Sequence, residues 1–116
     1  MKTIILTGGT GYLGRHLSSA LETEGYHVLC LRRAFSDEQA EALFTQQPVF
    51  AVIHLATCYG RNGESMAELT EGNLLFPLKV LHLAIKHKVK AFLNTDTILT
   101  RFLNPYALSK AQFAEW

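Results

Sequence analysis

The sequence contains little of what disulfide-rich, metal-binding or membrane proteins need. Its only cysteines are Cys30 and Cys58, and its five histidines never pair at metal-ligand spacing. We therefore predict no disulfide framework, no metal site and a reducing, cytoplasmic location. The amino-terminal apolar run, Thr3–Leu6, is too short for a signal peptide, and no segment approaches the roughly 18 apolar residues of a membrane span. A formal net charge of +1 gives no field for nucleic acid or an acidic membrane.

Apolar segments alternate along the 116 residues in a pattern that predicts one domain. The runs that read as strands are Lys2–Thr7, His27–Leu31, Val49–Leu55 and Ala91–Asn94. Helical patterns lie between them: one that Gly25 can end, one from Ser36 to Gln47, one from about residue 65 to Lys88, and a last one that begins at Pro105. This order predicts an α/β fold with a parallel, doubly wound sheet of the Rossmann type. In the third helix the spacing predicts an inner face of Leu74, Leu78, Leu81 and Ile85.

Residues 7–14 read TGGTGYLG and connect the first predicted strand to the first helix. The glycines fit two registers, GxGxxG from Gly9 and GxxGxxG from Gly8, and both continue through Gly11 and Gly14. A glycine turn in this context binds the pyrophosphate of a dinucleotide at the helix amino terminus. The predicted cofactor-binding residues of this turn are Gly8, Gly11, Tyr12, Leu13 and Gly14. The alternative is an ordinary glycine-rich connection.

Tyr106 and Lys110 lie four residues apart and therefore on one face of the last helix. A free phenol has a pKa near 10, so acid–base work near pH 7 needs about 4 kcal/mol of stabilisation of the phenolate. One positive charge at about 4 Å supplies an amount of that order in a partly screened site. The pair predicts proton transfer beside a nicotinamide, although an amphipathic helix start after Pro105 would give the same spacing.

The second strand ends at Arg32 and Arg33, and no carboxylate follows before Asp37. An acidic residue at this position would bind the ribose 2′-hydroxyl of NAD. Guanidinium groups instead match a phosphate bidentately. We therefore expect NADP(H) to be preferred and NAD(H) to be possible, unless the two arginines are only a solvated basic pair.

The TGGTGYLG and YxxxK segments resemble the short-chain dehydrogenase/reductase superfamily, in its extended branch of nucleotide-sugar epimerases, dehydratases and reductases. Val52–Ala56 is similar to a strand motif of that branch, and Asn73 stands where the branch has a helix asparagine. The amino-acid sequence of residues 54–61 and 94–97 is most similar to that of dideoxysugar 4-ketoreductases of the CDP-abequose synthase type. The resemblance covers the whole chain, which corresponds to the N-terminal part of such an enzyme.

This resemblance implies roles for several further residues. Leu55, Ala56 and Thr57 would lie over the cofactor, and Lys110 would hold the nicotinamide ribose. Thr97 would hydrogen-bond the reacting oxygen, with Thr95 as the rival if the strand register slips.

Asn73 and Pro77 suggest a proton relay in the third helix. Proline lacks an N–H and pushes against the carbonyl four residues back, which here belongs to Asn73. We hypothesise that this carbonyl holds a relay water toward Lys110. A helix kinked only for packing is the alternative.

Two departures from that branch bear on the sheet and on activity. Only fifteen residues separate Arg33 from Val49, so a further strand and its acidic residue are missing and the sheet should end early on that side. The substrate lobe that follows in such enzymes is absent, so we expect residues 1–116 alone not to catalyse. Ala91–Asn94 should then be an open edge, Phe113 and Trp116 should lack cover, and the chain should form a homo-oligomer.

The function expected from these features is NAD(P)-dependent reduction of a nucleotide-linked 4-keto sugar, with hydride from NADPH and Tyr106 as the proton donor. One alternative is a nucleotide-sugar epimerase or dehydratase that keeps a bound NAD. The other is a dinucleotide-binding fragment without catalysis.

Overall fold

The computed structural model describes residues 1–116 and contains one sheet of four strands in the order β2-β1-β3-β4. The strands are β1 (Thr3–Thr7), β2 (His27–Leu31), β3 (Ala51–His54) and β4 (Ala91–Asn94), and every neighbouring pair is parallel. This confirms the predicted α/β sheet. It also confirms that the sheet ends early on one side, because β2 is an edge strand with no further strand beyond it.

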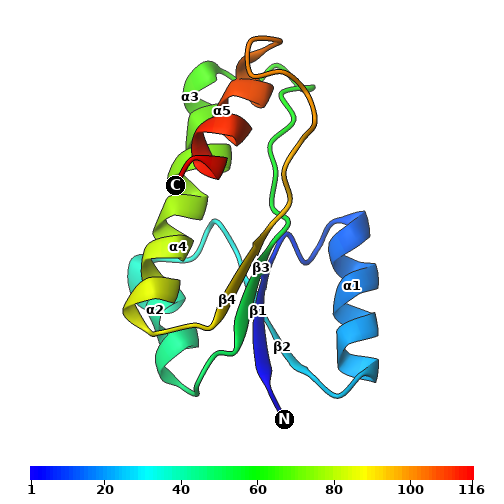
Figure 1. Ribbon diagram of the computed structural model, residues 1–116, viewed down its shortest axis with the longest axis vertical. Helices are drawn as coiled ribbons and strands as arrows, with labels where there is room; N and C mark the ends of the chain where they lie inside the picture. Colours follow the sequence, from blue (N-terminus) through cyan, green and yellow to red (C-terminus); the bar gives the residue numbers. More distant parts are fainter.

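The register brings the carboxyl ends of the strands level with one another. Thr7 pairs with both Leu31 and His54, and His54 pairs with Asn94. The loops that follow the strands therefore leave the sheet together at one end, which is the upper end in Figure 1. Ligands of open parallel sheets bind outside this end.

Helices cover both faces of the sheet, as a doubly wound fold requires. Helix α1 (Tyr12–Thr23) lies on one face, and α2 (Asp37–Thr45) and α4 (Phe76–Lys86) lie on the other (Figure 1). Helix α1 ends just before Gly25, which has φ +93°. A capping box between Ser36 and Gln39 begins α2. None of the helices combines the length and apolar character that a bilayer crossing requires.

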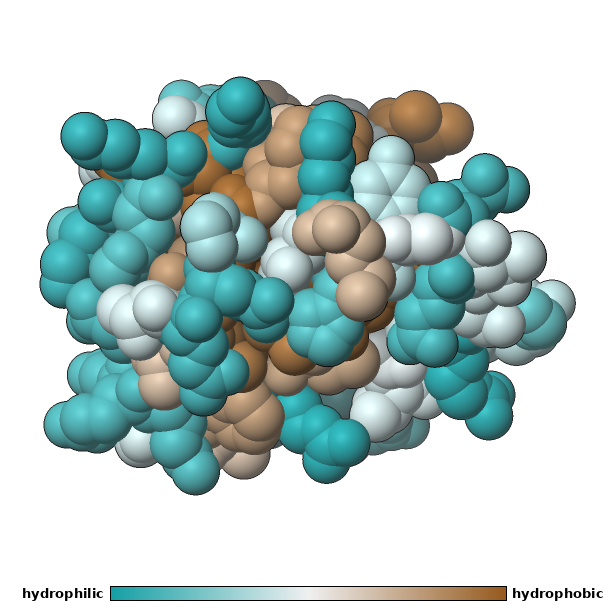
Figure 2. All heavy atoms as spheres, turned by 90° about the horizontal axis from the view of Figure 1, so that it is seen from below, coloured by the Kyte–Doolittle hydropathy of each residue, from teal (hydrophilic) through white to brown (hydrophobic).

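The main core lies between the sheet and the α2–α4 layer. Its buried members share apolar side chains that point inward from strands and helices: Ile5, Leu31, Phe44, Val49, Val52, Phe76, Val80 and Ala84. Seen from below, toward the amino ends of the strands, hydrophilic side chains surround the apolar atoms that remain visible (Figure 2). The amino end of the sheet is therefore largely polar at its surface.

The predicted inner face of the third helix is wrong. Ile85 is 70% exposed and Leu74, Leu78 and Leu81 are only half-buried, whereas Val80 and Ala84 are buried against the sheet. The helix is apolar over more than one face, so periodicity alone does not select the face that packs. Val80 and Ala84 are the members of α4 that join the core with Phe76. The segment also divides into α3 (Met66–Thr70), a π-helical turn η1 (Glu71–Leu75) and α4.

Helix α5 (Pro105–Ala114) covers the carboxyl end of the sheet beside η1 and α3 (Figure 1). The expectation that Phe113 lacks cover is wrong, because its ring is buried against His54 at 5.7 Å and Phe92 at 6.0 Å between centroids. Elements already present in the chain supply that cover. Trp116 is 78% exposed, in line with the expectation for that residue.

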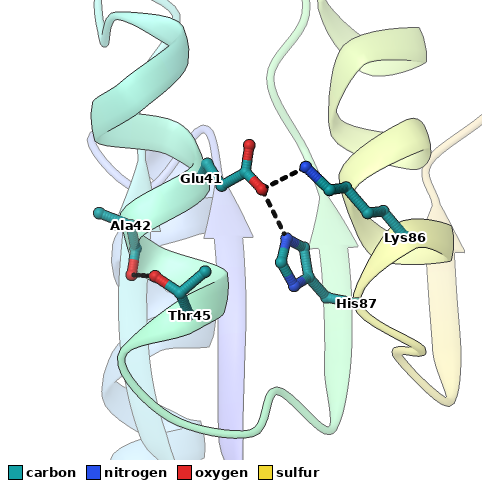
Figure 3. A network of polar contacts seen from close by, with 5 residues as sticks. All are labelled: Glu41, Ala42, Thr45, Lys86 and His87. Atoms are coloured by element: carbon teal, nitrogen blue, oxygen red, sulfur yellow. Dashed lines mark hydrogen bonds and ion pairs between the residues drawn. The ribbon is translucent and has the colours of Figure 1, made fainter.

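A charged cluster joins α2 to α4 on the outer surface (Figure 3). Glu41 accepts hydrogen bonds from Lys86 Nζ at 2.5 Å and His87 Nε2 at 3.1 Å. These two hydrogen bonds lower the pKa of the Glu41 carboxyl, Lys86 contributing more. His87 also stacks on Phe44, with 5.7 Å between the ring centroids. The cluster links the two helices of this layer at their surface.

Candidate cofactor cleft and active site

A cleft of about 1070 Å³ opens at the carboxyl ends of β1, β2 and β3. Its lining includes every residue predicted to bind the cofactor except Lys110: Gly8, Gly11, Tyr12, Leu13, Gly14, Arg32, Arg33, Leu55, Ala56 and Thr57. These residues come from three separate segments of the chain. The topology thus gathers them into one elongated site.

The glycine turn adopts the register that begins at Gly8. Gly8 has φ +73°, and a Cβ there would lie 2.7 Å from the amide nitrogen of Ala56. A Cβ on Gly14 would overlap the carbonyl oxygen of Gly8, which accepts a hydrogen bond from the Gly11 amide at 3.2 Å. Gly8 and Gly14 therefore have to lack side chains for the strand, turn and helix to pack together. Of the two registers left open by the sequence, the structure fits GxxGxxG.

The amino terminus of α1 is built to receive an anion. Its N-cap is Gly11, which has no side chain to cap the helix, and the first turn holds no acidic residue. The amides of Tyr12, Leu13 and Gly14 have no acceptor within the structure. Unsatisfied amides and the helix dipole both favour negative charge at this point. The turn thus fits the pyrophosphate of a dinucleotide.

Thr7 ties the end of β1 to the cleft wall that follows β3. Its Oγ1 accepts hydrogen bonds from the amides of Leu55 at 3.1 Å and Ala56 at 3.2 Å. The hydroxyl proton is then left for His54 Nδ1 at 2.7 Å, which makes Nε2 the protonated nitrogen of that ring. Sequence reasoning missed this role of Thr7. A polar residue that closes an otherwise apolar strand was the signal available.

His54 makes the stability of the protein depend on pH. Burial first, and then the nearby charge of Lys110, lower the pKa of His54 to about 4 from 6.5. Below pH 6.5 the unfolded chain binds a proton that the folded chain excludes, so stability is constant above that pH and falls as pH drops toward 4. We expect a loss on the order of 3 kcal/mol over this interval, measured by urea denaturation.

His54→Gln should remove most of this acid-dependent loss, whereas His82→Gln, at an exposed position on α4, should leave it in place. Equal pH profiles for wild type and His54→Gln would contradict the assignment.

Tyr106 and Lys110 both lie on α5 and are not among the residues that line the cleft. Lys110 is buried, and its Nζ donates a hydrogen bond to the carbonyl oxygen of Thr95. Burial lowers the pKa of Lys110, and the carboxylate of Asp96 partly opposes that effect. The half-buried ring of Tyr106 packs against Tyr59 in a tilted arrangement, with 5.4 Å between centroids. Because Tyr59 itself lines the cleft, Tyr106 adjoins the site gathered around the glycine turn.

The two candidate threonines after β4 have different hydrogen bonds. The Thr95 hydroxyl donates to the carbonyl of His54 at 2.9 Å. The Thr97 hydroxyl accepts from the amide of Leu99 at 3.2 Å, which leaves its own proton free to donate. The structure forms no hydrogen bond between Thr97 and Tyr106, so it does not bring these two predicted site residues together directly. The Thr97 hydroxyl is therefore free to donate a hydrogen bond, whereas the Thr95 hydroxyl is already engaged.

Asn73 contacts the site through its side chain. The amide accepts from Cys58 N at 2.8 Å, donates to Cys58 O at 2.7 Å and donates to Ser109 Oγ at 3.2 Å. Ser109 Oγ donates in turn to the carbonyl of Tyr106 at 2.9 Å. Asn73 thus links the loop after β3 to α5, a contact that sequence reasoning missed. Lys110 bonds Thr95 rather than Asn73, and the relay role of the Asn73 carbonyl stays a prediction.

Comparison with known proteins agrees with this geometry. The chain is 29% identical to CDP-abequose synthase of Salmonella typhimurium over 97% of its own length and 46% of that protein. Among solved structures it superposes on UDP-glucose 4-epimerase of Bifidobacterium longum in complex with NAD⁺ and UDP, with a TM-score of 0.83, 20% identity, and coverage of 98% of this chain and 47% of that one. UDP-glucose-4-epimerase of Stenotrophomonas maltophila with bound NAD gives a TM-score of 0.86 at 14% identity, over 99% and 47%.

The chain spans about half the length of the curated relatives it matches over nearly its whole length. The sequence pattern of the NAD dependent epimerase/dehydratase family matches residues 4–116, which is almost the entire chain. The match includes the glycine turn, the strand that ends at His54 and the YxxxK helix. The chain therefore belongs to the NAD-dependent epimerase/dehydratase family.

Proposed function

We propose that this chain is the cofactor-binding part of an enzyme that reduces the 4-keto group of a nucleotide-linked sugar. One observation carries the proposal: the cleft that begins at the uncapped amides of α1 extends to Tyr59, and the Tyr59 ring packs against Tyr106. A nucleotide bound along this cleft ends beside the proposed proton donor. The similarity to CDP-abequose synthase supports a sugar nucleotide as the substrate class.

The residues of the cleft have separate tasks in this proposal. The amides that begin α1 hold the pyrophosphate, Leu55, Ala56 and Thr57 cover the cofactor, and Lys110 holds its nicotinamide ribose. The bound cofactor supplies a hydride to the carbonyl carbon of the sugar. Tyr106 donates its phenolic proton to the carbonyl oxygen, and the Lys110 ammonium stabilises the phenolate that remains. Thr97 donates a hydrogen bond to the same oxygen.

The test of this function uses the chain alone and the chain joined to the carboxyl-terminal half of CDP-abequose synthase. We expect the joined enzyme to consume NADPH in the presence of a 4-keto sugar nucleotide, and residues 1–116 alone to bind cofactor without turnover. Conversion of a sugar nucleotide with no net consumption of NADPH would favour an epimerase that retains NAD. Cofactor binding with no turnover in the joined enzyme would favour a non-catalytic module.

We propose a preference for NADP(H), because Arg32 and Arg33 line the cleft where β2 ends and neither takes part in any of the three ion pairs of the structure. Dissociation constants of NADPH and NADH, measured by nicotinamide fluorescence at one salt concentration, should differ at least tenfold in favour of NADPH. Both epimerases named above are described with NAD, so tighter binding of NADPH would distinguish this chain from them. Equal affinity, or tighter binding of NADH, would contradict the preference.

We also propose a cytoplasmic location, since both cysteines are free thiols.

We further propose that the chain self-associates through the side that carries β4. This strand is an open edge, and large apolar side chains stand exposed on it, in the loop that follows and after α5: Leu93, Ile98, Phe102, Leu103 and Trp116. Unpaired edges and exposed apolar surface both recruit another chain. Light scattering at micromolar concentration should give a dimer or larger species. A monomer across that concentration range would contradict this part of the proposal.

A further inference from the structure

The wall of the cleft contains a buried glycine, Gly72, that belongs to none of the sequence motifs. It lies in the π-helical turn η1 and lines the cleft together with Arg33 and Cys58. A Cβ placed on Gly72 would overlap the guanidinium of Arg33 and would lie 3.2 Å from Cβ of Cys58. The guanidinium therefore rests directly on the backbone of the π-helical turn, in the space that any other side chain at position 72 would occupy.

This contact distinguishes the two arginines that follow β2. Both line the cleft, but only Arg33 lies against Gly72. A guanidinium seated against backbone loses less rotamer freedom when it binds a ligand than one that extends into solvent. Its planar donors are suited to a phosphate, which they bind bidentately.

We infer that Gly72 sets the cofactor selectivity of this chain by seating Arg33, whose guanidinium binds the 2′-phosphate of NADP(H). Arg33 is the phosphate-binding residue, Arg32 adds only general positive charge, and Gly72 is a positioning residue. The inference rests on the proposed preference for NADP(H) and goes beyond it, because it assigns selectivity to a residue on η1, far in sequence from β2.

The substitution Gly72→Ala tests the seat without removing the charge. The group that the new methyl displaces first is the end of a flexible arginine side chain, so the change moves Arg33 and leaves the fold in place. Arg33→Gln removes the charge from the same seat, and Arg32→Gln is the matched control at the neighbouring position. Circular dichroism checks that each variant is folded.

Two small probes isolate the 2′-phosphate. Adenosine 2′,5′-bisphosphate and 5′-AMP differ only in that group, and calorimetric titration of the full chain gives both affinities at one salt concentration. We expect Gly72→Ala and Arg33→Gln each to weaken the bisphosphate about tenfold and 5′-AMP less than twofold. Arg32→Gln should weaken the bisphosphate less than threefold. The double variant should bind no more weakly than Arg33→Gln alone, since both changes remove one interaction.

The outcomes separate this inference from the proposal beneath it. A wild-type chain that binds both probes equally, or neither, refutes the NADP(H) preference and the inference with it. The inference alone is refuted if the wild-type chain prefers the bisphosphate but Arg33→Gln leaves the ratio of the two affinities unchanged. It is also refuted if Arg32→Gln loses more affinity for the bisphosphate than Arg33→Gln does. Because Arg33 is exposed and its substitution does not threaten the fold, this result holds even if Gly72→Ala proves unstable. Additive losses of bisphosphate affinity in the double variant would also refute the positioning of Arg33 by Gly72.

Discussion

Tyr106→Phe should lower the turnover number of the joined reductase about 10²- to 10⁴-fold, the usual contribution of a positioned proton donor. Phenylalanine keeps the ring that packs against Tyr59 and removes only the hydroxyl. The site therefore keeps its shape, and the affinity for NADPH should stay within twofold of wild type. Steady-state kinetics with a 4-keto sugar nucleotide and fluorescence titration of NADPH measure the two quantities.

Lys110→Met is the companion variant, because methionine fills the same buried space without the charge. It should lower both turnover and cofactor affinity, since the ammonium is proposed to serve the phenolate and the nicotinamide ribose. Turnover within threefold of wild type in Tyr106→Phe would show that another group donates the proton.

The fold could be predicted almost completely from local patterns. Strand runs bounded by Gly25, Pro48 and Pro105 gave the element order, and parallel pairing follows from the alternation with helices. The gap between Arg33 and Val49 predicted the early end of the sheet. Prediction failed where more than one packing was compatible with the same pattern. Helix α4 carries apolar side chains on several faces. Tertiary packing decides which of these faces contacts the sheet, and the periodicity of the sequence does not predict it.

The cleft could be predicted because its residues belong to a continuous turn and to strand ends, which the register brings together. The residues that support it could not. Thr7, Ser109 and Gly72 act through contacts with segments 36 to 49 positions away, as in the hydrogen bonds of Thr7 to Ala56 and of Asn73 to Ser109. The cover of Phe113 could not be predicted for the same reason, since its partners on β3 and β4 are distant in sequence.

The glycine turn provides the second large prediction. Gly14→Ala should cost on the order of 3 kcal/mol or more of unfolding free energy, because the added methyl overlaps the carbonyl of Gly8 and lies 2.8 Å from Cα of Gly9. Those atoms are backbone, and Gly8 is already held at φ +73° against Ala56, so the turn has no direction in which to yield. Urea denaturation measures the loss.

Gly11→Ala is the matched control within the same motif. A Cβ at Gly11 meets nothing closer than the carbonyl of Gly8 at 3.5 Å, and its φ of −74° suits any residue. Its unfolding free energy should therefore stay within about 1 kcal/mol of wild type, as expected for alanine at an N-cap. Its effect should appear in binding instead, because the methyl stands where the pyrophosphate is proposed to approach the first amides of α1. If Gly14→Ala were as stable as Gly11→Ala, close packing of strand on helix would not be the reason for the third glycine, and the turn would serve the ligand alone.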